Sequence, residues 1–246
     1  MEKIQVSNYL INEFQYSEAI KTLRTNLIFS GESIKAVALT SCNKGEGKST
    51  ISFQLACSLA QNNQKVLFIE SDLSAGVLQN RLNFRKKIEG LSHYLAGTTE
   101  LDKVVYPTDL GLDIMFSGTR VVNSSELLGS EKFDSLISDA KQKYDYIIVD
   151  AAPLGQIVDC AVIAHAVDGV LMVIDSNQNN YKFELKIKNQ IEKAGGKVLG
   201  AVLNRAKFET KDYYYRKKYY NKYGYNYNNY SVAQNCQKND NTEDIK

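Results

Sequence analysis

Residues 41–50 read SCNKGEGKST, directly after KAVALT at residues 35–40 and directly before a run with helical spacing. The short apolar run is typical of a buried strand. Gly45 and Gly47 let the backbone curl so that successive N–H groups point at phosphate oxygens. This strand–loop–helix context predicts a site for a nucleoside triphosphate, because a plain turn between such elements rarely carries GKST.

The polar residues of this loop have separate predicted roles. Lys48 supplies a positive charge for the β and γ phosphates. Ser49 offers its hydroxyl to Mg²⁺ at the helix N-terminus, where the helix dipole also favours anions. The usual pattern begins with a Gly where this chain has Cys42. The residues predicted to bind ATP are Gly45, Glu46, Gly47, Lys48, Ser49 and Thr50, with Asn204 as an adenine contact at the end of the last strand.

Apolar runs alternate with helical stretches as far as residue 204. Further strands are expected at 66–69, 112–116, 146–149, 170–174 and 198–203, and helices at roughly 76–83, 88–96, 124–143, 157–166 and 179–194. Few polar residues interrupt the strands, as is typical when both faces are covered. The pattern predicts an α/β fold, a P-loop NTPase with a mostly parallel central sheet and helices on both faces.

Carboxylates stand at the ends of two predicted strands. Glu70 and Asp72 follow the second strand, and Asp150 follows the fourth. Ligands of open parallel sheets bind beyond the C-terminal ends of the strands. We therefore predict that Ser49, Asp72 and Asp150 hold Mg²⁺, directly or through water.

Composition limits the possible functions. A net charge of +2 and 43% hydrophobic residues are ordinary for a soluble globular protein and suggest no bulk nucleic-acid role. The four cysteines form no CxxC pair, which argues against zinc and favours a reducing cytoplasm. No apolar run approaches the ~20 residues of a membrane span. We expect a cytoplasmic protein whose membrane association, at the inner face, comes through a partner.

Three parts of the chain are predicted. Residues 1–16 form an N-terminal arm, expected to be loosely held, and a helix capped by Ser17 opens a nucleotide-binding domain over residues 17–204. Residues 205–246 carry too few apolar side chains to offset the entropy of ordering. They are expected to form a disordered tail, with at most a helical start.

The tail holds a tyrosine cluster. Residues 212–230 read DYYYRKKYYNKYGYNYNNY, and the tail has a net charge of +4. Because apolar partners for a core are absent from this stretch of sequence, we expect the tyrosines to act through their phenol hydroxyls. The predicted phosphate acceptors are Tyr213, Tyr214, Tyr215, Tyr219, Tyr220, Tyr223, Tyr225, Tyr227 and Tyr230. Because a phenol has a pKa near ~10, a carboxylate should accept or orient its proton, and we assign this to Asp72 with Glu70 behind it.

These features together resemble the bacterial tyrosine autokinases of capsule and exopolysaccharide synthesis, the CpsD/CapB group. The resemblance covers about residues 18–230. It includes EAIKTLRTNLIF at 18–29, GEGKST at 45–50, VLFIESD at 66–72, NSSELLGSEKF at 123–133, YDYIIVDAAP at 144–153, VDCAVIAHAVDGVLMV at 158–173 and the tyrosine cluster. The phosphate loop alone is generic, and its combination with the tyrosine tail is specific.

The resemblance implies a kinase that uses ATP and Mg²⁺, with Lys48, Glu70, Asp72 and Asp150 as catalytic residues. It also implies a ring-like homo-oligomer in which one subunit's tail enters the neighbouring site. The ring helix would present Glu18, Lys21 and Arg24. The implied partners are a membrane-anchored polysaccharide co-polymerase or activator, with polysaccharide-synthesis enzymes as possible substrates, and no nucleic acid.

Four positions depart from the family pattern. Lys44 replaces a Pro, Glu70 an Asp, Ser74 an Arg and Lys21 an Arg. Lysine lacks the bidentate pairing of arginine with carboxylates. Glu70 moves its carboxylate by about an ångström, and misplacement on that scale can cost on the order of a hundredfold in rate.

Three alternatives remain open from the sequence. The first is a MinD/ParA-like positioning ATPase, although its signature lysine falls at Asn43. The second is a catalytically impaired nucleotide-binding regulator of the same machinery. The third treats the tyrosine–lysine tail as a stacking platform for nucleic acid or polysaccharide.

Overall fold

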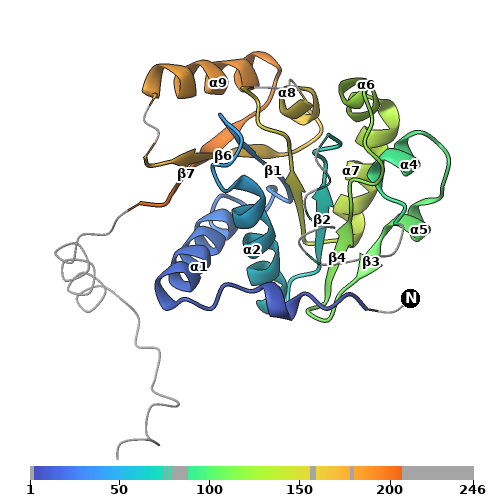
Figure 1. Cartoon of the computed structure of the whole chain (residues 1–246), viewed down its shortest axis with the longest axis horizontal. Helices are drawn as coiled ribbons and strands as arrows, with labels where there is room; N and C mark the ends of the chain where they lie inside the picture. The colour runs from blue at the N-terminus through green and yellow to red at the C-terminus, as the bar shows by residue number, and fades with distance from the viewer. Residues whose placement is uncertain are drawn as a thin grey trace, which may run out of the picture. The chain divides into compact units, whose positions relative to one another are not determined.

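The computed structural model describes residues 3–74, 76, 78, 82, 88–155, 159–177 and 180–206. Its centre is a seven-stranded sheet in the order β3-β4-β2-β5-β1-β6-β7, drawn in Figure 1. The strands are β1 (Ala36–Ser41), β2 (Val66–Glu70), β3 (Tyr106–Pro107), β4 (Leu112–Met115), β5 (Tyr146–Asp150), β6 (Gly169–Asp175) and β7 (Val198–Asn204). All neighbouring pairs are parallel except β3 with β4. The predicted α/β class is confirmed.

Side-chain alternation along the strands creates two separate cores. On β1, Val37 and Leu39 join the core beneath α1 (Phe14–Ile28) and α2 (Lys48–Gln61). Ala36 and Ala38 point to the opposite core. Because both faces are buried, the strands read as nearly continuous apolar runs, which is why the sequence shows them so clearly.

The second face of the sheet is covered by a larger set of helices, of which α7 and α9 are the longest (Figure 1). They are α4 (Leu91–Leu95), α5 (Leu101–Val104), α6 (Ser124–Leu128), α7 (Glu131–Lys143), α8 (Asp159–Ile163) and α9 (Tyr181–Lys193). The single helix expected over 124–143 is two helices. Gly129 ends α6, and the extended backbone of Ser130 starts α7. No helix in the described ranges is long and apolar enough to cross a membrane.

The N-terminal arm is packed, which corrects the expectation of a loosely held segment. Ile4 and Val6 are buried, and Ile4 makes a parallel bridge to Thr108 beside β3. Asp109 fixes the arm further, since its carboxylate accepts hydrogen bonds from Val6 N at 2.7 Å and Ser7 N at 3.2 Å. Two isolated apolar residues are too weak a sequence pattern to predict this strand-like docking.

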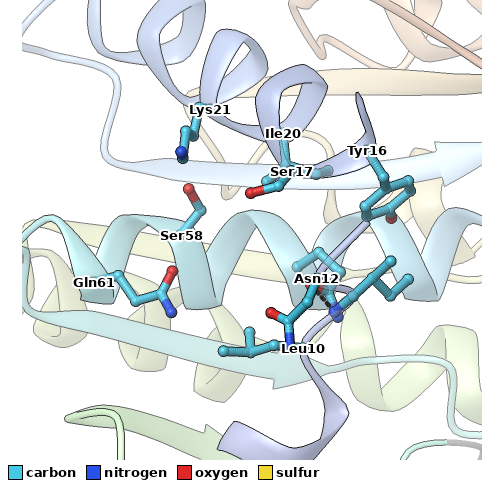
Figure 2. Close-up of a pocket in the computed structure, with 10 residues that line it drawn as sticks. Leu10, Asn12, Tyr16, Ser17, Ile20, Lys21, Ser58 and Gln61 are labelled. Atoms are coloured by element: carbon cyan, nitrogen blue, oxygen red, sulfur yellow. Dashed lines mark hydrogen bonds between the residues drawn. The ribbon is translucent and has the colours of Figure 1, made fainter. Parts of the chain in front are cut away.

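The arm continues along α2. Gln54 Nε2 donates to Tyr9 O at 2.8 Å, and Gln54 Oε1 accepts from Ile11 N at 3.2 Å. Figure 2 shows the pocket of about 120 Å³ that the arm encloses with α1 and α2. The first long helix begins at Phe14 after Glu13, not at Ser17 as predicted, because the docked arm delivers the chain to α1 one turn earlier.

Most predicted boundaries fall within one or two residues of the observed ones, while β3 and α5 were not anticipated. Residues 1–206 form one compact unit, two residues beyond the predicted end of the domain. The helix expected over 76–83 lies largely outside the described residues. The tail from residue 207, with all nine clustered tyrosines, lies outside them entirely.

Candidate nucleotide-binding site

The loop between β1 and α2 has the backbone shape that its glycines predict. Gly45 and Gly47 both adopt left-handed conformations, with φ of 88° and 90°. Gly47 also has no room for a side chain, since a Cβ there would lie 2.1 Å from Asn204 Nδ2. Other residues would be strained at both positions. The loop therefore turns sharply into the first turn of α2.

Glu46 holds the loop from within. Its carboxylate accepts hydrogen bonds from Cys42 N at 2.9 Å and from Asn43 Nδ2 at 3.2 Å, and its side chain is buried. Burial, with the nearby Glu46 charge, raises the pKa of the Cys42 thiol to about 12. Cys42 is thus a packed small residue rather than a reactive thiolate.

The end of β7 holds the loop from outside. Asn204 Nδ2 donates to Glu46 O at 2.8 Å, and Arg205 Nη2 donates to Gly45 O at 2.9 Å. Arg205 also forms an ion pair with Asp175 at the end of β6. Hydrogen bonds from Asn177, together with this ion pair, lower the pKa of Asp175.

Sequence reasoning missed Arg205 and Asp175. Arg205 is assigned there to the tail, and Asp175 sits 30 residues away from it along the chain. The only available signal was an acidic residue at one strand end and a basic residue at the next, on neighbouring parallel strands. Asn204, predicted as an adenine contact, lies at the loop and in this state donates to its backbone.

Lys48 and Asp150 form a buried ion pair at the base of the loop. Lys48 Nζ lies 2.6 Å from Asp150 Oδ1, and the two side chains are only 6% and 4% exposed. Ser52, one turn into α2, places its hydroxyl 2.9 Å from both Lys48 O and Asp150 Oδ1. Ser52 was also missed, although its position four residues after Lys48 puts it on the same face of α2.

The described residues fit a nucleotide phosphate. The site lies at the N-terminus of α2, where the helix dipole favours an anion and adds to the Lys48 charge. Ser49 is half-buried, with its hydroxyl 3.2 Å from Lys48 Nζ. In the described ranges no cluster of three His, Cys, Asp or Glu side chains could hold a metal by itself.

Glu70 is next to Asp150 in the register of β2 and β5, but its surroundings differ. Glu70 Oε1 accepts from Leu78 N at 2.7 Å, and Oε2 accepts from Ser117 N at 3.1 Å and Ser117 Oγ at 3.0 Å. Burial raises the pKa of Glu70 and exceeds the opposing effect of these hydrogen bonds. With both oxygens occupied, Glu70 is placed to support the loops after β2 and β4.

Asp72 stands at the rim of the site, half-buried. Its Oδ1 accepts from Ser74 Oγ at 2.6 Å and from Ser74 N at 3.2 Å. Ser74 is the residue found where the family pattern has Arg. In this chain it forms a local turn that orients the Asp72 carboxylate. Among the described residues, these hydrogen bonds reach only one of the two Asp72 oxygens.

The predicted oligomer residues lie on α1. Lys21 Nζ pairs with Glu18 Oε1 at 2.8 Å on the exposed surface. Arg24 Nη1 instead donates to Ser58 O at 2.9 Å, within the same chain. Glu18 and Lys21 are thus exposed, whereas Arg24 ties α1 to α2.

Known proteins are similar to this chain in both sequence and fold. An AAA domain family matches residues 34–198. Tyrosine-protein kinase CpsD of Streptococcus agalactiae serotype III (strain NEM316) is 38% identical over 189 residues, covering 76% of this chain and 82% of the relative. The putative tyrosine-protein kinase CapB of Staphylococcus aureus is 33% identical over 202 residues, covering 81% and 88%. The crystal structure of the chimerical protein CapA2B2 has a TM-score of 0.75 at 31% identity, covering 84% of this chain and 93% of that chain.

The MinD/ParA-like alternative shares the fold. MinD of Pyrococcus horikoshii has a TM-score of 0.61 at 23% identity, over 72% of this chain and 73% of that chain. This likeness establishes a common architecture and nothing more specific. The relatives at 33–38% identity match more of this chain and carry tyrosine-kinase names.

Proposed function

We propose that this chain, which belongs to the bacterial protein-tyrosine kinase family of CpsD and CapB, phosphorylates its own C-terminal tyrosine cluster in trans within an oligomer. The observation that carries the proposal is the buried Lys48–Asp150 pair beneath a phosphate loop, in a chain that carries nine clustered tyrosines within residues 213–230. The site supplies the means of holding a donor, and the cluster supplies acceptors.

ATP with Mg²⁺, when bound, supplies the transferable phosphoryl group. The N-terminus of α2 and Lys48 hold the phosphates, and Lys48 offsets the charge that develops during transfer. Ser49 and Asp150 would hold the metal, with Asp72 at the rim. Asp72 accepts or orients the phenol proton of a tail tyrosine, because the hydrogen bonds from Ser74 in the described part of the chain reach only one of its two oxygens.

Nucleotide binding requires the Lys48–Asp150 pair to separate. In the chain alone the two charges neutralise each other at 2.6 Å, so neither is left as an uncompensated buried ion. Bound phosphates would supply an anion to Lys48, and bound Mg²⁺ would supply a cation to Asp150. Ser52 keeps Asp150 oriented during this exchange, since its hydroxyl lies 2.9 Å from the carboxylate.

The charge of the tail favours both approach and release. Residues 205–246 carry a net charge of +4, and +3 remains in residues 207–246 once Arg205 is counted with the folded unit; this charge favours entry into a site that holds carboxylates and phosphates. Each phosphate adds about −1.5 to −2. Three or four modified tyrosines therefore reverse the sign of the tail and favour its release from a neighbouring subunit, which loosens the oligomer.

The wider role we propose is regulation of capsular or exopolysaccharide synthesis and export. The protein acts in the cytoplasm, held at the inner face of the membrane by a membrane-anchored co-polymerase or activator. Polysaccharide-synthesis enzymes are further possible substrates. The family membership supports this role, and a solved relative that is a chimera named CapA2B2 is consistent with a second component.

The test is incubation of the purified full chain with Mg²⁺ and ATP, with and without the cytoplasmic tail of a candidate activator. Phosphotyrosine is mapped by mass spectrometry. We expect phosphate within residues 213–230 in the wild-type chain and none in a Lys48→Met variant. Because that variant leaves Asp150 buried without its cation, Ser49→Ala serves as a second, structurally milder variant. An unmodified cluster in the presence of the activator contradicts the proposal.

A second candidate function is a nucleotide-binding regulator without transfer activity. Two observations favour it: Glu70 has both oxygens engaged by structural donors, and Ser74 replaces the Arg of the family pattern. ATP binding measured by calorimetry, together with no phosphotyrosine under activating conditions, separates this function from the kinase.

A further inference from the structure

We propose that Tyr181, in the folded domain, is a further phosphate acceptor that a second copy of the chain modifies. The inference rests on the proposed kinase function and extends it beyond the tyrosine cluster. Tyr181 opens α9 and its side chain is 73% exposed. The remaining tyrosines of the described ranges are all half-buried, namely Tyr9, Tyr16, Tyr94, Tyr106, Tyr144 and Tyr146.

The phenols of the half-buried tyrosines show why exposure matters. Tyr144 Oη donates to Asp113 Oδ2 at 2.8 Å, and Tyr106 Oη donates to Glu89 O at 3.0 Å. Burial raises the pKa of Tyr16 to about 12. A phenol that is enclosed and engaged cannot reach the donor site of another molecule without local unfolding. Tyr181 faces solvent and needs no such step.

The sequence around Tyr181 repeats that of the cluster. Asn179-Asn180-Tyr181 is the same tripeptide as Asn228-Asn229-Tyr230 in the tail. Lys182 follows Tyr181 directly, as basic residues accompany the tyrosines of the cluster. A site that accepts the tail therefore meets a similar local pattern at the start of α9.

The exposed face of α9 has the charge that such a site attracts. Lys182, Lys186 and Lys193 line one open groove with Leu185 and without a carboxylate. A cationic surface favours approach to bound phosphates and to Asp72 of another copy. The tail from residue 207 has the same property, with a net charge of +3.

The anchoring of α9 requires that the donor be a second copy. Ile187 and Ile191 are buried in the core, and Asn180 Oδ1 accepts from Phe183 N at 3.1 Å. Phe183 also packs against Gly155, where a Cβ would lie 2.8 Å from the Phe183 ring and 2.2 Å from Cys42 O. The first turn of α9 is thus wedged beside the phosphate loop. It cannot swing so that Tyr181 enters its own site.

The transfer is an ordinary phosphoryl exchange with ATP as co-reactant. A bond forms between Tyr181 Oη and the γ-phosphorus, and the bond from that phosphorus to the β,γ-bridging oxygen breaks. ADP leaves with the electron pair. The phenol proton passes to Asp72 of the donor copy. The product carries about −1.5 to −2 charge beside Lys182 and Lys186.

The test mixes two full-length proteins with Mg²⁺ and ATP. The donor carries Tyr181→Phe and is otherwise wild type. The acceptor carries Ser49→Ala to silence its own transfer, and Phe at all nine cluster positions. Mass spectrometry then locates phosphate on each protein, and a matched acceptor carries Tyr181→Phe in addition. A third acceptor carries Lys182→Gln and Lys186→Gln.

We expect phosphate on Tyr181 of the acceptor, its complete loss in the Tyr181→Phe acceptor, and a several-fold decrease in the double Gln acceptor. Tyr144 should stay unmodified. Phosphate on the donor's own cluster with none on Tyr181 overturns this inference and leaves the proposed function standing. Equal modification of Tyr144 and Tyr181 also overturns it, because exposure and local sequence then select nothing. A donor whose cluster stays unmodified with activator present overturns the proposed function as well.

Discussion

The ends of β2 and β5 hold two buried carboxylates in the same register and on the same face of the sheet, yet the carboxylates are held differently. Asp150 is paired with a lysine and a serine hydroxyl. Glu70 is held by two backbone N–H groups and a serine hydroxyl. Side-chain partners can exchange when a ligand arrives, whereas backbone donors are fixed by the fold. The comparison teaches that burial of an acidic residue does not by itself identify a catalytic group. Whether the carboxylate can bind a ligand depends on whether its partners can exchange.

Removing Lys48 is the strongest test of Asp150, the carboxylate whose partners are side chains. In Lys48→Met, Asp150 stays buried without its cation, and we expect a loss of about 3–5 kcal/mol in the free energy of unfolding. Phosphoryl transfer should also vanish. The double variant Lys48→Met with Asp150→Asn should regain most of the stability and none of the activity. Urea unfolding and a phosphotyrosine assay measure the two effects. A double variant no more stable than the single one would show that the pair is not the source of the loss.

Glu70→Gln tests the carboxylate that is held mainly by backbone donors. The amide NH₂ of Gln is a donor and replaces one of the two acceptor oxygens of Glu70. Either Leu78 N or Ser117 N is then left buried without an acceptor. We expect a loss of roughly 1–3 kcal/mol in stability. Transfer activity, measured where the variant is fully folded, should fall less than tenfold. A loss of a hundredfold or more would instead assign Glu70 to the chemistry itself, as the family resemblance implies.

Ser52→Ala sharpens the description of Asp150. The substitution removes one of two partners and keeps the ion pair, so the expected loss of stability is about 1 kcal/mol. The Michaelis constant for ATP should change little while the rate constant of transfer falls several-fold, because Asp150 loses its orientation. Steady-state kinetics with ATP as the varied substrate separate the two parameters. Unchanged kinetics would mean that Ser52 does not orient the carboxylate during transfer.

The pH dependence of stability should distinguish Glu70, whose pKa is raised, from Asp168, whose pKa is lowered. Burial raises the pKa of Glu70, so its contribution to stability is complete below its unfolded pKa and decreases as pH rises through the folded value. Glu70→Gln should therefore destabilise more at pH 5 than at pH 8. Asp168 is the opposite case: burial alone would raise its pKa, but hydrogen bonds from Lys141 and from backbone N–H groups lower it.

Asp168→Asn consequently should destabilise more at neutral pH than in acid, because the contribution of a depressed carboxyl is present above its unfolded pKa and lost as pH falls. Unfolding of both variants and the wild type at each pH provides the comparison. Parallel pH profiles for the two variants would contradict the assignment of opposite pKa shifts.

The sequence predicts the sheet well because its strands are continuous apolar runs that end at glycines or carboxylates. This pattern is local and can be recognised without knowing any contacts. It predicts the phosphate loop for the same reason, since GEGKST is local. Partners distant in sequence are not accessible in this way. Ser117 is 47 residues from Glu70, and Arg205 is 160 residues from Gly45. Nothing in the local pattern of either residue distinguishes it from an ordinary surface side chain.

The N-terminal arm shows that distant contacts can also order a segment whose own sequence does not predict a defined structure. Ile4 and Val6 are buried by contacts near β3, more than 100 residues away. Short segments gain order from tertiary contacts rather than from propensity, so the sequence underestimates them. Arg24 likewise belongs, by resemblance, to an intersubunit surface, and in the folded chain it holds Ser58 O of α2.

The clamp at the end of β7 has a mechanical consequence. Arg205, which grips the Gly45 carbonyl, is only two residues from Lys207, where the tyrosine-bearing segment starts. A pull on that segment is therefore applied almost directly to the phosphate loop. In the proposed kinase, capture of that segment by another molecule would act on the Arg205 contact that holds the phosphate loop.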